Sequence, residues 1–349
     1  MTATPPTVAP DIAEDLPFPI DALAAIQSLR DVKPVRQPIT CSDPRANCEI
    51  AVGSSWRRVE DFADSRFGTK TLIAYNQPSL PGAHVRAAVT RVPREINPSD
   101  FLRILIAKSS ARIVRERLIA GTVGELPDFL TIESLAGVQT VTRRNATKDA
   151  DRIFMVEAGM PRSDYAAAAN ELLVTAASFK LSNPEGRLTA EPLRTIALAR
   201  PRFRAAVPAS CELYPSEPPA PGRVRMRLRD PADGGRAACL LDVAERADRD
   251  TLQDILVQHL REMEDRGIRG SDVRIEPWLG NHCFREASIS LAVVDVGGIS
   301  CDWRLMLLEH PATVVLISMI GPAFRRDPGR WAINKRTFEI LALSSTVET

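Results

Sequence analysis

Two apolar stretches, Ile153-Phe-Met-Val-Glu-Ala-Gly159 and Val315-Leu-Ile-Ser-Met-Ile-Gly321, decide the fold of this 349-residue chain. Each is apolar at odd and at even positions, a pattern typical of a strand that is covered on both of its faces. The two stretches also match each other in sequence. The chain therefore has two candidates for the central strand of two similar units.

Three further matches surround these strands, in the same order in each half of the chain. They pair Ala51–Trp56 with Ala206–Cys211, Asp100–Ile106 with Asp250–Leu256, and a helix bracketed by Tyr165 and Ser178 with one bracketed by Trp331 and Ser344. Ordered self-similarity at a nearly constant spacing indicates duplication. A chain of this length also accommodates two domains, each with its own core. We therefore predict two divergent copies of one α/β unit.

Local signals predict the elements of each copy. In the second copy, helical spacing from Leu252 to Met263 ends at Gly267, a usual residue after a helix C-terminus. Strands are expected over 287–295, 299–308 and 313–320, followed by a closing helix that begins at Asp327-Pro328. The predicted fold class is α+β: two tandem α/β sandwich domains, each a mainly antiparallel sheet with a central and a C-terminal helix. Extra residues before the last strand of copy two predict longer or additional strands there.

The repeat phasing also predicts the domain boundaries. We expect a disordered tail with a short N-terminal helix over 1–45, a first domain over 46–182, a linker over 183–199 and a second domain over 200–349. The prolines from Pro215 to Pro221 resemble a linker by composition. They fall between the first two strands of copy two, so they are predicted to form a loop.

Composition excludes several classes of partner. The chain has 45 Lys and Arg against 44 Asp and Glu, a net charge of +1, so no global field attracts nucleic acid. No stretch has the apolar length of a membrane span, so no direct membrane insertion is expected. The six cysteines are scattered and the N-terminus has no apolar signal region, which favours reduced thiols and a cytoplasmic location.

A search for catalytic and metal-binding motifs finds none. Nucleotide-binding glycine loops, HExxH and GxSxG are absent, so no cofactor is expected. His282-Cys283 could join His259, Cys301 and His310 in a zinc site, but the spacing typical of metal ligands is missing, and we predict no metal. Ser54 and Ser55 are candidate nucleophiles, but the sequence indicates no residue that would act as their general base. The interpretation is therefore a protein that is not an enzyme.

The order of these elements resembles the Mog1/PsbP-like α/β sandwich superfamily. The resemblance is carried by the Val52-Gly-Ser-Ser-Trp56 corner, a central amphipathic helix, a meander, and an aromatic-led helix that ends in Ala177-Ser178-Phe179. It covers about residues 46 to 182 and 200 to 346. A similar bacterial group serves as effector-associated chaperones of type VI secretion and pairs two such domains. The resemblance implies a protein-binding module, and Cys211 departs from it where copy one has Trp56.

The residues expected to contact a partner are of two kinds. The apolar ones, on strands that require cover on both faces, are Ile153, Met155, Val315, Ile317 and Met319. The basic ones alternate along one strand as Arg223, Arg225, Arg227 and Arg229. Two alternatives compete with partner binding: full burial of the apolar residues within their own domain, and an arginine row that is the solvated side of an edge strand.

The leading functional hypothesis is a chaperone or adaptor that shelters hydrophobic helices of a partner protein. Because burial of apolar area dominates such binding, the hypothesis predicts little dependence on salt, whereas an arginine-mediated contact predicts strong dependence. A structural assembly component and an enzyme with a dispersed site are the alternatives. The oligomeric state stays open.

Overall fold

The computed structural model describes residues 15–29, 34–60, 68–121, 124–135, 137–216, 221–231, 238–246, 251–268, 270–277, 284 and 286–347. The chain forms two compact units. The first consists of Met1–Val92 and Pro98–Leu188, and the second of Pro93–Asn97 and Thr189–Thr349.

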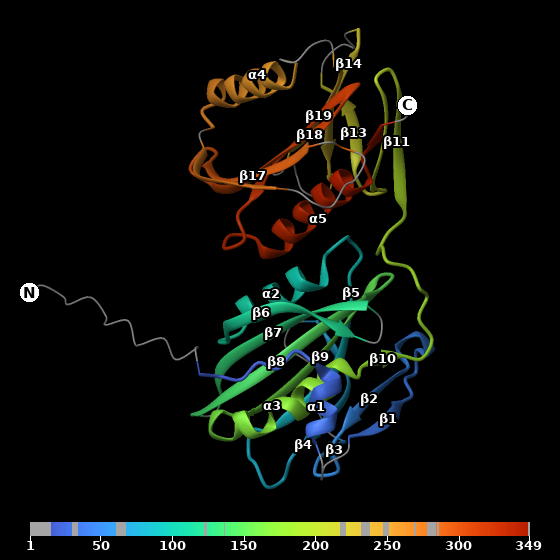
Figure 1. Cartoon of the computed structure of the whole chain (residues 1–349), viewed down its shortest axis with the longest axis vertical. Helices are drawn as coiled ribbons and strands as arrows, with labels where there is room; N and C mark the ends of the chain where they lie inside the picture. The colour runs from blue at the N-terminus through green and yellow to red at the C-terminus, as the bar shows by residue number, and fades with distance from the viewer. Residues whose placement is uncertain are drawn as a thin grey trace, which may run out of the picture. The chain divides into compact units, whose positions relative to one another are not determined.

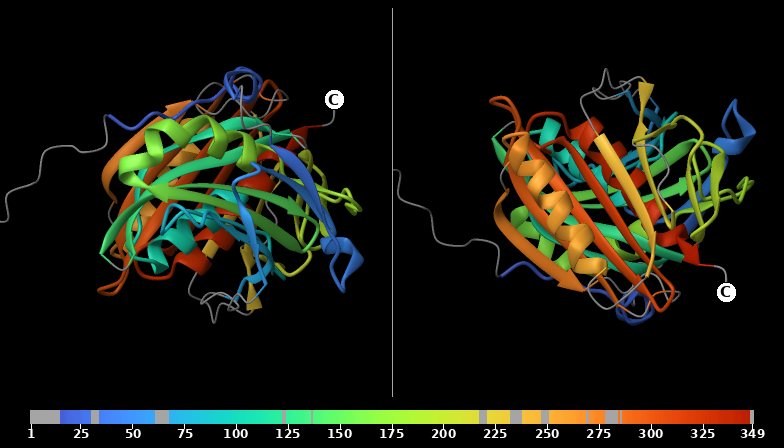
Figure 2. Two further views of the ribbon diagram at one scale, coloured as in Figure 1. Left: turned by 90° about the horizontal axis from the view of Figure 1, so that it is seen from below. Right: turned by 90° about the horizontal axis from the view of Figure 1, so that it is seen from above.

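The first unit is built on a seven-stranded antiparallel sheet with the strand order β3-β4-β5-β9-β8-β7-β6. The strands are β3 (Arg57–Val59), β4 (Lys70–Asn76), β5 (His84–Arg91), β6 (Arg112–Gly121), β7 (Gly124–Leu135), β8 (Val138–Asp149) and β9 (Arg152–Pro161). Helix α2 (Pro98–Lys108) covers one face and helix α3 (Arg162–Ala177) the other (Figures 1 and 2). Helix α1 (Ala22–Ser28) packs on α3 through Ala25.

The second unit repeats this arrangement. Its sheet has the order β13-β14-β15-β19-β18-β17-β16. The strands are β13 (Glu212–Pro215), β14 (Arg223–Arg229), β15 (Ala238–Glu245), β16 (Gly270–Pro277), β17 (Glu286–Asp295), β18 (Ser300–His310) and β19 (Thr313–Pro322). Helix α4 (Thr251–Asp265) lies along one face, as the right-hand view of Figure 2 shows, and α5 (Pro328–Ser344) covers the other.

Each unit also has a three-stranded sheet beside its closing helix. The strands are β1 (Val35–Ile39), β2 (Cys48–Val52) and β10 (Lys180–Leu181) in the first unit, with β11 (Leu193–Ala199), β12 (Arg202–Pro208) and β20 (Thr346–Val347) in the second. A 3-10 helix, η1 (Pro44–Ala46), precedes β2. The predicted α+β class with a mainly antiparallel sheet, a central helix and a C-terminal helix is confirmed.

The same hydrogen bond closes both units. In the first, Ser178 Oγ accepts from the backbone N–H of Ala51 at 2.7 Å, and in the second Ser344 Oγ accepts from that of Ala206 at 2.7 Å. These residues are the pairs that the sequence repeat matches. Tyr165 and Trp331 likewise occupy the fourth position of α3 and α5. The identical strand order and these equivalent contacts are what a duplication predicts.

The register of the central strands differs by one residue from the sequence match. The hairpins pair Asp149 with Arg152 in the first unit and His310 with Thr313 in the second, so Phe154, not Ile153, is equivalent to Val315. A shift of one residue moves every side chain to the opposite face of a strand. The hydropathy pattern could not reveal which residues of the two strands are equivalent, because both strands are apolar on both faces.

Two predicted boundaries and the predicted lengthening of the meander also need correction. Strand β11 lies in the predicted linker, where its backbone pairs with β12, and strand β1 lies in the predicted tail, where it pairs with β2. Residues 1–14 of the tail are outside the described part of the chain. The strands β6–β9 are as long as β16–β19, so the extra residues of copy two do not extend the meander. Some of them lie in helix α4 (Thr251–Asp265), which has 15 residues against 11 in α2, and others lie between Pro277 and Glu286, mostly outside the described residues.

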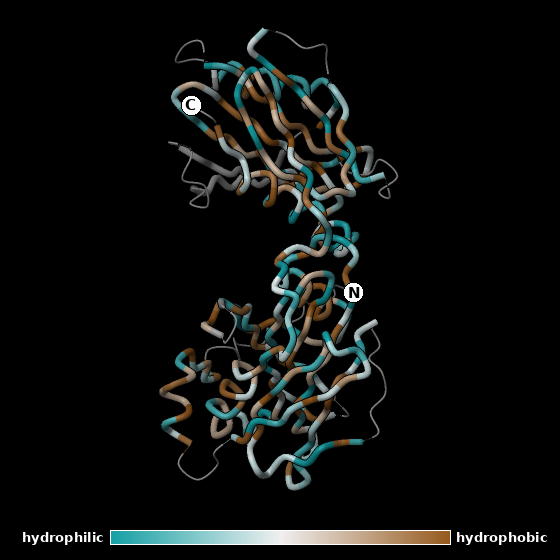
Figure 3. Tube along the Cα trace, turned by 90° about the vertical axis from the view of Figure 1, so that its right-hand side faces the viewer, coloured by the Kyte–Doolittle hydropathy of each residue, from teal (hydrophilic) through white to brown (hydrophobic). Residues whose placement is uncertain are grey.

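Both predicted helix ends of the second unit are confirmed. Gly267 has a φ of 74° after α4, and the N–H of Ile268 donates to the carbonyl of Met263 at 2.9 Å, which satisfies a carbonyl of the last turn. Asp327 caps α5 by accepting from the N–H of Arg330. Figure 3 shows apolar segments, in brown, in both units, and each unit has a core of buried apolar residues.

Candidate functional site

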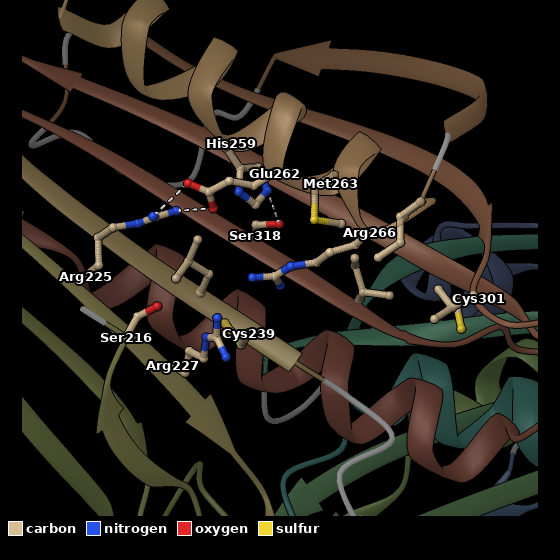
Figure 4. Close-up of a pocket in the computed structure, with 14 residues that line it drawn as sticks. Ser216, Arg225, Arg227, Cys239, His259, Glu262, Met263, Arg266, Cys301 and Ser318 are labelled. Carbon is tan, nitrogen blue, oxygen red and sulfur yellow. Dashed lines mark hydrogen bonds and ion pairs between the residues drawn. The ribbon is translucent and has the colours of Figure 1, made fainter.

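The second unit contains a pocket of about 220 Å³ between helix α4 and the sheet (Figure 4). Its lining comes from α4, from strands β14, β15, β18 and β19, and from the residues that follow β13, α4 and β17. The residues are Ser216, Arg225, Arg227, Cys239, Leu240, His259, Glu262, Met263, Arg266, Ile268, Val296, Cys301, Ser318 and Ile320. Basic groups and apolar side chains thus face the same space.

The corresponding face of the first unit carries a network of charges. Arg144 pairs with Glu133 at 2.7 Å and with Glu157 at 2.9 Å, and Arg86 pairs with Glu157 at 2.7 Å. Burial alone would raise the pKa of Glu157, but Arg144 and Arg86 outweigh it and lower that pKa to about 2. Ionised side chains therefore fill this layer of the first unit.

The second unit has lost that network. The strand pairings place Leu240 at the position of Arg86, Val294 at that of Glu133, Leu305 at that of Arg144, and Ser318 at that of Glu157. All four replacements are uncharged, and serine is smaller than the glutamate that it replaces. Divergence between the copies therefore places a pocket in the second unit at a layer that charges occupy in the first.

Two members of the predicted arginine row are fixed beneath α4. The side chain of Arg225 is 3% exposed, and it pairs with Asp242 at 2.9 Å and with Glu262 of α4 at 2.9 Å. Arg223 also pairs with Asp242, at 2.6 Å. The strand that carries the row, β14, is second in the sheet, beside β13. The strand is therefore not an edge strand, and only Arg227 and Arg229 of the row are exposed to solvent.

Arg227 and Arg266 present the other charges at the pocket. Both are exposed, and neither side chain has an ion pair or hydrogen bond with another residue in the described part of the chain. Arg229 lies farther along β14, against the ring of Tyr214 and 3.5 Å from Glu212. Of the row, Arg225 and Arg227 line the pocket, and partner contact by the arginines stays a prediction.

His259, Ser318 and Trp303 form a buried polar group beside the pocket. His259 Nε2 lies 2.8 Å from Ser318 Oγ, and Trp303 Nε1 donates to the same oxygen at 2.9 Å. Burial lowers the pKa of His259 to about 4, although the charge of Glu262 opposes this shift. The imidazole is therefore neutral at physiological pH. The repeat could have identified Ser318 only with the correct register.

The reactive side-chain types at this site are held in weakly reactive states. Ser318 is 3% exposed and its oxygen contacts two partners. Burial raises the pKa of the Cys239 thiol, and burial also raises that of Cys301, so both thiols stay protonated. The serine–imidazole distance suits proton transfer, but an imidazole with a pKa of about 4 is a weak base.

We predict that acid destabilises the second unit through His259. Its pKa is about 4 in the folded protein against 6.5 for the free side chain, so the unfolded chain binds the proton first. The contribution of the neutral His259 imidazole to the unfolding free energy is fully present above pH 6.5 and is lost as the pH falls towards 4. At pH 5 this one group should cost about 2 kcal/mol.

The measurement is a denaturant titration at pH 7 and at pH 5 on the parent and on His259→Gln, whose amide can still contact Ser318. The loss of unfolding free energy between the two pH values should be smaller by about 2 kcal/mol in the variant. Equal losses in both proteins would show that the imidazole titrates normally.

The five apolar residues predicted to contact a partner are buried in the cores. Ile153, Met155, Val315, Ile317 and Met319 are each at most 5% exposed. Elements of their own unit cover both faces of these strands, as the packing of Val315 with Phe338 and of Val314 with Ile255 illustrates. This corrects the expected receiving surface: these side chains are not open to a partner.

The described residues contain no group of three or more His, Cys, Asp or Glu side chains arranged for a metal ion. His282 and Cys283, considered for zinc, lie outside them. None of the helices in this part of the chain has the length and apolarity needed to cross a membrane. Ser54 and Ser55 lie in the turn between β2 and β3 and are not among the residues that line the pocket.

Comparison with known proteins gives structural likenesses only. No protein-family model matches the chain, and no curated protein does. The chain is similar to PsbP (CyanoP) from Synechocystis sp. PCC 6803, with 9% identity and a TM-score of 0.33 over 42% of this chain and 92% of that one. It is also similar to TplEi, an immunity protein of T6SS from Pseudomonas aeruginosa, with 12% identity and a TM-score of 0.27.

A third similar structure is that of the Tle4–Tli4 complex, with 12% identity and a TM-score of 0.25. The likenesses to TplEi and to this complex each span 89% of this chain and 97% of the other. All three TM-scores are below 0.5, so the functional proposal rests on the geometry of the pocket.

Proposed function

We propose that the protein is a non-enzymatic protein-binding module, an adaptor or chaperone, that holds its partner at the pocket beneath α4. The observation that carries this proposal is the divergence of the two copies. The second unit replaces a buried charge network with small and apolar residues, and two exposed arginines without partners among the described residues stand at the resulting pocket. An opening with unsatisfied positive charge suits a partner that carries acidic groups.

The state of the polar group supports binding rather than catalysis. A serine nucleophile needs a base of suitable pKa that is itself oriented by a third group. Here Trp303 donates to Ser318 Oγ, and the pKa of His259 is lowered to about 4. The resemblance to paired effector chaperones, stated from the sequence, makes a secreted effector the expected class of partner.

The proposal predicts a salt-sensitive interaction. Raising the salt from 0.1 M to 1 M shortens the Debye length from about 10 Å to about 3 Å, which weakens contacts between exposed charges. The hydrophobic-helix hypothesis predicted little change with salt. With the five apolar residues buried, charge contacts at Arg227 and Arg266 become the expected source of affinity.

The test places a photo-crosslinking amino acid at Arg261, an exposed position of α4 outside the pocket, and at Arg57 of β3 as a matched control. In native cells a single protein should crosslink from position 261 only. The combined change Arg227→Gln and Arg266→Gln should lower the affinity for the partner by at least about tenfold, whereas Arg261→Gln should leave the affinity unchanged. A partner that is retained at 1 M salt and by the double variant would contradict the proposal.

A further inference from the structure

Three polar groups at the pocket beneath α4 have unused hydrogen-bonding capacity. They are the exposed guanidinium groups of Arg227 and Arg266, and Nδ1 of His259, a residue that is 4% exposed. No partner for His259 Nδ1 is found among the described residues. Figure 4 shows that both arginines and the imidazole belong to the lining of one space.

The hydrogen bonds of Ser318 are satisfied by one tautomer of the neutral His259 imidazole. Trp303 Nε1 can only donate, so it occupies a lone pair of Ser318 Oγ. The hydroxyl hydrogen then needs an acceptor, and His259 Nε2 at 2.8 Å provides one. In a neutral imidazole one nitrogen accepts and the other carries the hydrogen. With Nε2 as the acceptor of the Ser318 hydroxyl, His259 Nδ1 is a buried N–H donor without an acceptor among the described residues.

The carboxylates nearby are already engaged. Glu262 pairs with Arg225, and Asp242 pairs with both Arg225 and Arg223. The charges of Arg227 and Arg266 are thus in excess among the residues that line the pocket. The side chains of Arg227 and Arg266 and the Nδ1 of His259 are three groups that can donate, and they favour an anion as the occupant.

The lining also has an apolar part. Met263, Leu240, Ile268 and Ile320 contribute hydrocarbon or thioether surface. The volume of about 220 Å³ corresponds to about seven water molecules at ~30 Å³ each. A bare inorganic anion would leave most of this surface uncovered, whereas a negative group on a short apolar body would satisfy both parts of the pocket.

We propose that the pocket beneath α4 binds an organic carboxylate. Arg227, Arg266 and the Nδ1–H of His259 hold the negative group, and its short apolar body packs against Met263 and Ile320. A free carboxylic acid and an acidic side chain of a bound protein share this chemistry. Recognition of the carboxylate does not depend on whether a protein partner exists.

The test follows the methyl resonance of Met263 in the full-length chain labelled with ¹³C-methyl methionine, assigned with Met263→Leu. Sodium hexanoate is the probe, hexanamide is its uncharged analogue, and sodium chloride keeps the ionic strength constant. Hexanoate should shift the Met263 signal saturably, and hexanamide should bind at least about tenfold more weakly. The double change Arg227→Gln and Arg266→Gln should abolish this preference, whereas Arg261→Gln should preserve it.

Equal binding of hexanoate and hexanamide would overturn the proposal, as would the absence of a saturable hexanoate shift. So would unchanged hexanoate binding in the double variant, which alters exposed residues and should leave the fold intact. A second arm separates the two sources. Release of the cell-derived partner by hexanoate identifies an acidic side chain as the occupant, and hexanoate binding without release identifies a free acid. Failure to find a partner would affect the proposed function alone.

Discussion

Replacing Asp128 with alanine should destabilise the first unit by about 3–5 kcal/mol, because it leaves a buried positive charge without its counterion. Arg143 and Asp128 are both fully buried, and Arg143 donates to the two carboxylate oxygens at 2.8 and 2.6 Å. Arg117 also pairs with Asp128, at 3.1 Å. Burial raises the pKa of Asp128 even though Arg143 opposes it, which shows how costly the ionised form is at this position.

The N-terminal segment closes this cluster. The carbonyl of Pro19 accepts from Arg143 at 2.9 Å, that of Phe18 accepts from Arg117 at 2.6 Å, and the Phe18 ring lies 3.5 Å from the Arg117 guanidinium. The unpaired arginines of the Asp128→Ala protein would still hold these carbonyls. Hydrogen exchange should therefore show the loss of protection first in β7 and β8.

Two variants control the interpretation of Asp128→Ala. The double change Asp128→Leu and Arg143→Met removes both buried charges and should recover much of the lost stability. Asp151→Ala breaks an ion pair with Arg91, whose side chain is 75% exposed, and should cost less than about 1 kcal/mol. A denaturant titration in which Asp128→Ala costs no more than Asp151→Ala would contradict the argument.

Replacing Phe338 with alanine should destabilise the second unit by about 3–5 kcal/mol. The ring is 1% exposed and packs beneath α5 with Met306, Leu308 and Ile317. Any water that entered the resulting cavity would contact only apolar walls. The unfolding free energy, measured in denaturant, should fall without a change in the fold of the first unit.

Trp331, the other aromatic of this helix, should be less sensitive. Trp331 and Phe338 are seven residues apart and so lie on the same side of a helix, and replacing a fully buried tryptophan with alanine costs about 3–5 kcal/mol. The ring is only partly buried: its Nε1 donates to Asp302 at 2.5 Å, and Phe324 meets it edge-on at 5.0 Å. We expect about half the cost of Phe338→Ala, and an equal or larger cost would show that the tryptophan is the main anchor.

The sequence was sufficient to predict the class and order of the elements, because its signals are local. The period-two alternation from Arg223 to Arg229, the helical spacing that ends at Gly267, and the Asp327-Pro328 start each depend on neighbouring residues alone. The ordered repeat added the relation between the halves. Short strands were missed where, as in β11, pairing with a neighbour rather than composition creates the strand.

The tertiary structure alone decided the register of the central strands and the position of the pocket. An alternation signal is lost when a strand is apolar on both faces, so only the hairpin pairings show that Ser318 replaces Glu157. The burial of Ile153 and Val315 and the exposure of Arg227 likewise depend on which helix covers which face. Which helix covers which face of a sheet is set by contacts between residues far apart in the chain. Local sequence patterns therefore do not predict it.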